Sequence, residues 1–189
     1  MDFIPDKRER ILAAAARLIV RNGLQCSMAA IAEEASVATG SLYNYFASKE
    51  ALVLGVYTRV STEMSDRLVT PPEADSNAEQ RVRGYIRLYI DFIWEDPERA
   101  RLFDYLDNTP LISFSDAAVI FGPFVQHGNA MIEVAQAAGV VRAGPPTMIM
   151  SFLRGSIRNT LKRRRLTETA LAKADRQLVA DMCWAAIKA

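Results

Sequence analysis

The chain of 189 residues is half hydrophobic, which supports a sizeable core and excludes wholesale disorder. Its formal net charge of +1 does not by itself indicate a nucleic-acid partner, and no stretch approaches the roughly 18 apolar residues of a membrane span. Two cysteines and one histidine exclude a disulfide scaffold and a multi-histidine metal site. We therefore expect a cytoplasmic protein with no membrane partner, no metal and no cofactor.

Helical spacing of apolar residues dominates the chain from its start. A first apolar stripe covers residues 11–19, with Asp6 suited to the start of its helix and Gly23 to its end. Ser48 is a good N-cap for a longer helix, because a second stripe follows over residues 53–64.

Proline and glycine divide the rest of the chain. Pro71-Pro72 and the polar residues 73–77 form the clearest break, and Ser76 and Glu79 then have the spacing of a capping box. Later helix boundaries are expected at Asp96-Pro97, Thr109-Pro110, Gly139, Pro145-Pro146 and the basic cluster 162–165, and Gly122-Pro123 predicts a kink or a fresh start. The last helix is expected to cover roughly Glu168 to Lys188. The pattern predicts an all-α protein of about nine helices.

Residues 27–46 have the pattern of two short helices crossing at a steep angle. Their small core would come from Ile31, Ala35, Val37, Leu42 and Tyr45, with Ala32 at the point of closest approach. Residues 36–38 form the turn, and the hydroxyl of Thr39 can cap the second helix. So short a unit needs the helices on either side for support.

The outer side of the second short helix carries uncharged donors and acceptors, namely Thr39, Ser41, Tyr43 and Asn44, and Lys49 follows it. Hydroxyl and amide groups can reach base edges or phosphate oxygens in a major groove, while a lysine neutralises a phosphate. This surface favours a helix-turn-helix that binds double-stranded DNA.

The stretch 27–52, SMAAIAEEASVATGSLYNYFASKEAL, resembles the DNA-binding signature of the TetR family of bacterial regulators. The resemblance covers about residues 4–64 and implies DNA-facing roles for Ser27, Thr39, Gly40, Ser41, Tyr43, Asn44, Tyr45 and Lys49. Tyr45 is alternatively a core residue. The family pattern often has Gly where this chain has Ser36, so the turn is either adopted by Ser at modest cost or looser.

The resemblance also implies how the chain is organised. A three-helix DNA-binding domain would occupy residues 1–50, and a helical domain for effector binding and dimerisation residues 51–189. Two recognition helices of a homodimer would then meet two half-sites of a palindromic operator. The last two helices are the implied dimer surface.

Two features of those last helices suit a dimer surface. Phe152, Gly155, Ser156 and Asn159 mix bulk with small residues, and an apolar stripe runs along the last helix through Leu171, Ala174, Leu178, Met182 and Ala185. An isologous four-helix contact would use both helices. The alternative is that the stripe packs inside one subunit.

The middle helices are rich in aromatic residues, and the resemblance implies a pocket among them for a small apolar or aromatic effector. Residues proposed to line it are Trp94, Phe103, Phe124, His127, Met131, Phe152, Ser156 and Asn159. Ordinary core packing is the alternative for each aromatic residue.

A ligand-responsive repressor is the leading hypothesis. An α-helical enzyme using acidic residues or His127 is the alternative, although no phosphate loop, nucleophile elbow or paired-carboxylate motif stands out and no catalytic residue is assigned.

Overall fold

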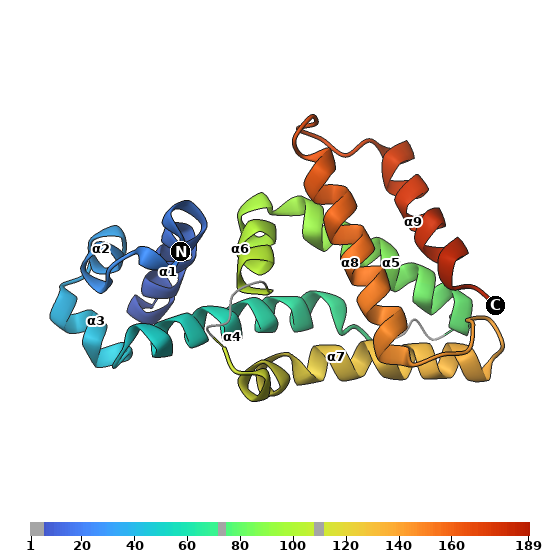
Figure 1. The fold of residues 1–189 in the computed structure, drawn as a ribbon, viewed down its shortest axis with the longest axis horizontal. Helices are drawn as coiled ribbons and strands as arrows, with labels where there is room; N and C mark the ends of the chain where they lie inside the picture. Colours follow the sequence, from blue (N-terminus) through green and yellow to red (C-terminus); the bar gives the residue numbers. More distant parts are fainter. Residues whose placement is uncertain (1–5, 72–74, 108–111) are drawn as a thin grey trace. The chain divides into compact units, whose positions relative to one another are not determined.

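The computed structural model describes residues 6–71, 75–107 and 112–189, and within these the regular structure is helical (Figure 1). The elements are α1 (Lys7–Asn22), the 3-10 turn η1 (Gly23–Gln25), α2 (Met28–Glu34), α3 (Thr39–Tyr45), α4 (Lys49–Leu68), α5 (Ala78–Glu95), α6 (Pro97–Asp107), α7 (Phe114–Ala137), α8 (Pro146–Arg164) and α9 (Lys173–Ile187). Nine α-helices in the described residues confirm the predicted all-α class. None of them is long and apolar enough to cross a membrane.

The chain forms two compact units. One contains Met1–Thr62 and Glu98–Ile120, and the other contains Glu63–Pro97 and Phe121–Ala189.

In the first unit, α1 packs against α2, and α2 packs against α3. The face of α1 that lies inward is the predicted stripe, which includes the fully buried Ile11, Leu12 and Ile19. The hydroxyl of Ser61 on α4 donates to the carbonyl oxygen of Ile120 at 2.6 Å and so ties α4 to the first part of α7.

In the second unit, α5 packs against both α8 and α9, which also pack against each other. The inward face of α5 is almost wholly buried: Val82, Tyr85, Ile86, Tyr89, Ile90, Phe92 and Ile93. An ion pair between Arg176 and Asp91, 3.0 Å apart, joins α9 to α5 at the edge of this core.

Three expected boundaries differ from the structure. The capping box before α5 is formed by Asn77 and Gln80, one residue later than predicted, because the Asn77 side chain accepts from the Gln80 N–H at 2.9 Å. Of the kink or fresh start expected at Gly122-Pro123, the fresh start is wrong, because α7 continues through Pro123 as one helix. Pro123 is exposed, so water can reach the carbonyl group that it leaves without a partner.

The last helix begins at Lys173 rather than Glu168. The N–H groups of Thr167 and Glu168 instead donate to the Arg164 carbonyl oxygen, at 3.1 and 3.0 Å, and so complete the end of α8. The predicted boundaries at Pro72 and Thr109-Pro110 lie outside the described residues.

Candidate functional site

The core of the helix-turn-helix is small and buried. Ile31, Ala32 and Leu42 are at most 1% exposed, and Phe46 is buried at the end of α3. A Cβ atom added to Gly55 of α4 would lie 2.9 Å from the Phe46 ring and 3.0 Å from the Leu12 side chain. Helix α4 therefore approaches both groups as closely as only a glycine allows.

The turn between α2 and α3 is tight, so Ser36 adopts the conformation that the family pattern often gives to glycine and the turn is not looser. Ser36 adopts the left-handed conformation, with φ of 55°. Its N–H donates to the Glu33 carbonyl oxygen and the N–H of Val37 donates to that of Ala32, each at 2.9 Å. These two bonds are those of a Schellman motif, which closes α2 and sends the chain into α3.

The structure corrects the predicted cap of α3. Its N-cap is Ala38, with no side-chain hydrogen bond, and Thr39 is the first helical residue, with an exposed side chain. Because the extended conformation that a cap requires falls on Ala38, the Thr39 hydroxyl is not used to close the helix.

The outer face of α3 combines five exposed residues with one half-buried serine. Thr39, Gly40 and Asn44 are exposed, Ser41 is half-buried, and Tyr43 and Tyr45 are 49% and 42% exposed. Tyr45 is therefore not a core residue of this unit. No other atom lies within 4 Å of a Cβ added to Gly40, so a partner's backbone or phosphate could approach the chain there.

Ser27 and Lys49 lie outside α3 and both bind the protein's own backbone. The Ser27 hydroxyl caps α2 by accepting from the Ala30 N–H at 3.1 Å. The Lys49 ammonium, on the first residue of α4, donates to the carbonyl oxygen of Leu24. A hydroxyl keeps its own proton and an ammonium two further protons, so each side chain can still donate to a phosphate.

An ion pair that the sequence pattern did not reveal joins α1 to α2. The Arg17 Nε lies 2.8 Å from a carboxylate oxygen of Glu34, and Arg21 approaches the other oxygen at 3.8 Å. The hydrogen bond from Arg17, with the charges of both arginines, lowers the pKa of Glu34. The two residues are 17 positions apart, so helical periodicity alone gave no signal.

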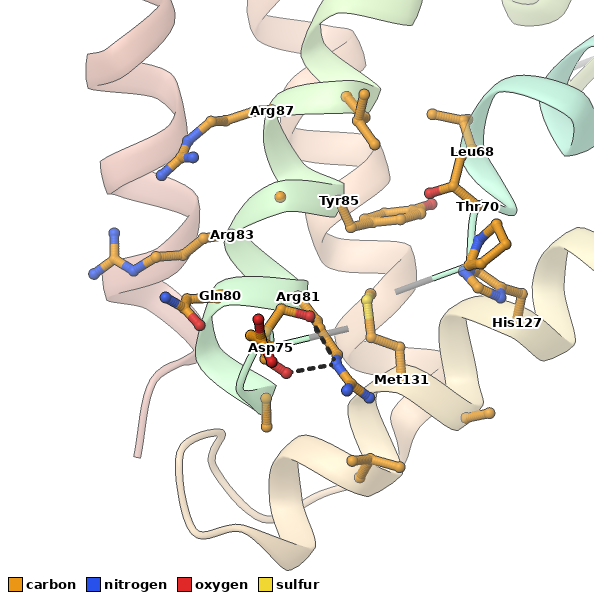
Figure 2. A pocket seen from close by; sticks show the side chains of 17 residues that line it. Leu68, Thr70, Asp75, Gln80, Arg81, Arg83, Tyr85, Arg87, His127 and Met131 are labelled. Carbon is orange, nitrogen blue, oxygen red and sulfur yellow. Dashed lines mark hydrogen bonds between the residues drawn. The ribbon is translucent and has the colours of Figure 1, made fainter. Parts of the chain in front are cut away.

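A pocket of about 750 Å³ lies in the second unit, between α5, α7 and the end of α4 (Figure 2). Of the eight effector residues predicted, His127 and Met131 line it. Tyr85 and Arg81 also line it, although sequence reasoning did not select them for the site. Tyr85 was recognisable only as one of many aromatic residues.

The structure does not bring the other six predicted effector residues into this pocket. Phe124 is buried beneath the Arg154 guanidinium. The Arg165 guanidinium lies over the Trp94 ring, 5.0 Å from its centre. Phe103 belongs to the other compact unit. Phe152, Ser156 and Asn159 lie one turn apart on α8, where Phe152 is 50% exposed and Asn159 is exposed.

Helices α8 and α9 carry an exposed apolar face. Met148 and Phe152 project from α8, and Leu178 and Met182 from α9, at 50% to 67% exposure. The opposite side of α9 is the buried one, containing Val179, Ala180, Cys183, Trp184 and Ile187. The predicted stripe of α9 therefore does not pack inside the described subunit. An apolar face of this kind is typical of a protein–protein contact.

Comparisons with known proteins agree with this arrangement. Residues 11–56 match the family described as "Bacterial regulatory proteins, tetR family". Over 98 residues the chain is 26% identical to the nucleoid occlusion factor SlmA of Marinomonas sp., covering 51% of this chain and 50% of that protein. Over 68 residues it is 38% identical to the HTH-type transcriptional repressor KstR of Rhodococcus jostii, covering 35% and 32%. The aligned region thus spans half or less of these relatives.

Solved structures are similar over nearly the whole chain. A putative tetR family regulator from Shewanella sp. has a TM-score of 0.82 at 22% identity, covering 98% of this chain and 100% of that one. A TetR family regulator from Marinobacter aquaeolei has a TM-score of 0.85 at 20% identity, covering 96% and 95%. Such identities establish the fold, while the N-terminal match identifies the motif. Residues 11–56 therefore carry the N-terminal motif of the TetR family of bacterial regulatory proteins, and the chain has the fold of the TetR family regulators to which it is similar.

Proposed function

We propose that this regulator is a homodimeric DNA-binding repressor that a small-molecule effector releases from a palindromic operator. The observation that carries the proposal is the outer face of α3. Its polar side chains point outward on a helix fixed by a buried core and a closed turn. Rigid presentation of uncharged donors and acceptors is what base recognition in a major groove requires.

In this proposal Thr39, Ser41, Tyr43, Asn44 and Tyr45 face the groove. Ser27, Lys49 and the backbone at Gly40 contact phosphates. Phosphate contacts position the motif and base contacts give it sequence preference. The name of KstR, a transcriptional repressor, supports repression as the mode of action.

The exposed apolar face of α8 and α9 supports a dimer. A single recognition helix offers few contacts, whereas two related by a two-fold axis can meet half-sites about 34–36 Å apart. Residues 1–50 then bind DNA, and residues 51–189 dimerise and bind the effector.

The pocket supports the effector response. Leu68, the last residue of α4, lines it, and α4 begins at Lys49, a few residues after α3. A ligand that displaces the end of α4 would alter the separation of the two recognition helices and weaken both half-site contacts at once. We expect this ligand to have an apolar or aromatic body.

A selection of DNA fragments from the source genome tests the proposal. We expect enrichment of a segment upstream of the regulator's own gene, containing an inverted repeat, with a mobility shift that fits two subunits per site. Asn44→Ala should reduce the enrichment about ten-fold or more. Failure of the wild-type protein to enrich any specific segment would overturn the proposal.

A further inference from the structure

The hydroxyl group of Tyr85, which lines the pocket, accepts a hydrogen bond but donates none. Tyr85 is only 4% exposed, and its ring extends from α5 toward Thr70 and the side of α7 that bears His127 (Figure 2). Its oxygen accepts a hydrogen bond from the Arg154 Nε at 2.8 Å. Among the described residues, the Tyr85 O–H donates to no protein acceptor. A buried donor without an acceptor is costly unless a ligand supplies one.

Arg154 places a permanent positive charge directly behind that hydroxyl. Its Nη2 donates to the Phe124 carbonyl oxygen at 3.2 Å, and the guanidinium lies 3.8 Å from the centre of the Phe124 ring. A Cβ added to Gly128 would lie 2.6 Å from Nη2, so Arg154 packs against the backbone of α7. No carboxylate in the described part of the chain pairs with Arg154. The charge is thus held by neutral groups alone, which is unusual for a partly buried cation.

The other polar groups on this side of α5 are mostly donors. Burial, together with the charge of Arg154, lowers the pKa of His127, so its neutral ring offers one N–H near pH 7. The Nε of Arg81 is fixed by the Ser76 carbonyl oxygen at 3.0 Å and hydroxyl at 3.1 Å, which leaves its terminal nitrogens free for a ligand. Asp75 is the acidic side chain among the lining residues.

Two further arginines in the lining do not add to this group. Arg83 and Arg87 project from the opposite side of α5 (Figure 2). Arg83 is also bonded to Glu79 at 2.7 Å and lies near Asp181 at 3.6 Å. The polar groups around the Tyr85 hydroxyl are therefore His127, which lines the pocket, and Arg154, which lies behind Tyr85 and supplies one permanent charge. The guanidinium of Arg81 is exposed and lies farther along the pocket, beside Met131 (Figure 2).

The rest of the same cavity is apolar. Leu68, Ala130, Met131 and Val134 contribute to its lining. A ligand matched to both parts has an apolar body and one group that accepts hydrogen bonds and carries a single negative charge. A carboxylate fits one cation and two neutral donors better than a dianionic phosphate, which would leave a charge uncompensated.

We propose that the effector of this regulator is an apolar carboxylate, whose anionic group is bound by the hydroxyl of Tyr85 and the ring of His127 in the field of Arg154. This inference rests on the proposed effector function. It adds the charge of the ligand and names the residues that recognise it.

A panel of matched probes tests the charge directly. Calorimetry would compare decanoate with decan-1-ol and decylamine, and 1-naphthoate with 1-naphthol, on the full-length dimer. We expect at least one carboxylate to bind about ten-fold or more tightly than its neutral partner, because charge-assisted hydrogen bonds contribute more than neutral ones. The same carboxylate should lower affinity for the operator, while decylamine should not bind.

Variants assign the preference to residues. Tyr85→Phe and Arg154→Gln should each reduce the ratio of carboxylate to alcohol affinity several-fold. Tyr89→Phe, one turn away and fully buried in the core, and Arg158→Gln, one turn along α8, are the matched controls and should keep it. Two independent variants keep the test valid if one of them fails to fold.

Equal binding of carboxylates and alcohols, tighter binding of the amine, or no binding of any carboxylate would overturn the inference. The proposed function is tested separately with a metabolite extract of the source organism. An extract fraction that releases the operator, when no carboxylate binds, would leave the effector response intact and reject only the anionic ligand. If no fraction releases the operator, the effector response itself fails.

Discussion

The hydroxyl oxygen of Tyr105 accepts a hydrogen bond from the backbone N–H of Leu24 at 3.0 Å. The carbonyl oxygen of Leu24 accepts a hydrogen bond from the Lys49 ammonium. Side chains from α6 and α4 thus satisfy both backbone groups of one residue in η1, just before α2. They fix the path of the chain into the helix-turn-helix.

Tyr105→Phe should lower the free energy of unfolding by about 1 kcal/mol, because the part-buried Leu24 N–H loses its acceptor. Urea denaturation measures the change. Tyr43→Phe removes the same atom from an exposed tyrosine and should leave stability unaltered. Equal effects at the two positions would show that the bond to Leu24 contributes nothing.

Ser36→Gly should stabilise the protein by about 0.5–1 kcal/mol, because glycine adopts the left-handed conformation without the steric cost of a Cβ atom. Ser41→Gly is the matched control within α3 and should destabilise by a similar amount, since glycine weakens a right-handed helix. Thermal unfolding of both variants decides the signs. Destabilisation by Ser36→Gly would contradict a strained turn.

Gly55→Ala should destabilise by about 1–3 kcal/mol, because the new methyl group would overlap the Phe46 ring and the Leu12 side chain. Gly84→Ala on α5 meets no atom within 4 Å and should stabilise by up to about 1 kcal/mol. Chemical denaturation compares the two. A neutral Gly55→Ala would show that α4 can move away from α1 at little cost.

Lys49→Met separates a structural role from a DNA-contacting role. Loss of the bond to Leu24 should reduce stability by about 1 kcal/mol. If each Lys49 also neutralises a phosphate, the slope of log affinity against log salt should become shallower by roughly 0.9 per subunit. An unchanged slope with reduced stability would confine Lys49 to the turn.

Glu34 makes the packing of α1 on α2 sensitive to acid. Since the pKa of Glu34 is lowered in the folded protein, its contribution is present near neutral pH and is lost as the pH falls below about 4.5. Glu34→Gln should therefore reduce the melting temperature at pH 7 but little at pH 3. Glu33→Gln, at the exposed position directly before it, should change the melting temperature at neither pH. A constant difference at both pH values would exclude the ion pair as the cause.

Much of the fold was predictable because its signals are local. Asp96-Pro97, Gly139 and Pro145-Pro146 lie at observed helix boundaries, and the spacing of Ile31, Ala32 and Leu42 predicted the buried core of the motif. Where two neighbouring residues could each serve as a cap, the sequence did not decide between them. Ala38 precedes α3 although Thr39 has the better capping side chain.

The pocket was less predictable, because its lining depends on which helices meet. His127 and Met131 line it, being one turn apart on the face of α7 that meets the pocket. Phe152, Ser156 and Asn159 share a face of α8 that points elsewhere, which composition could not show. The pairing of Arg154 with Tyr85 spans 69 positions, so no periodicity revealed it.

Fluorescence anisotropy on the selected operator tests the central claim, that the exposed face of α3 binds DNA. Asn44→Ala should weaken specific binding about ten-fold or more, as expected for one lost base contact, and leave non-specific binding nearly unchanged. Asn22→Ala, an exposed asparagine at the end of α1, is the control and should bind as the wild type does. Wild-type affinity in Asn44→Ala, Tyr43→Ala and Ser41→Ala alike would contradict the claim.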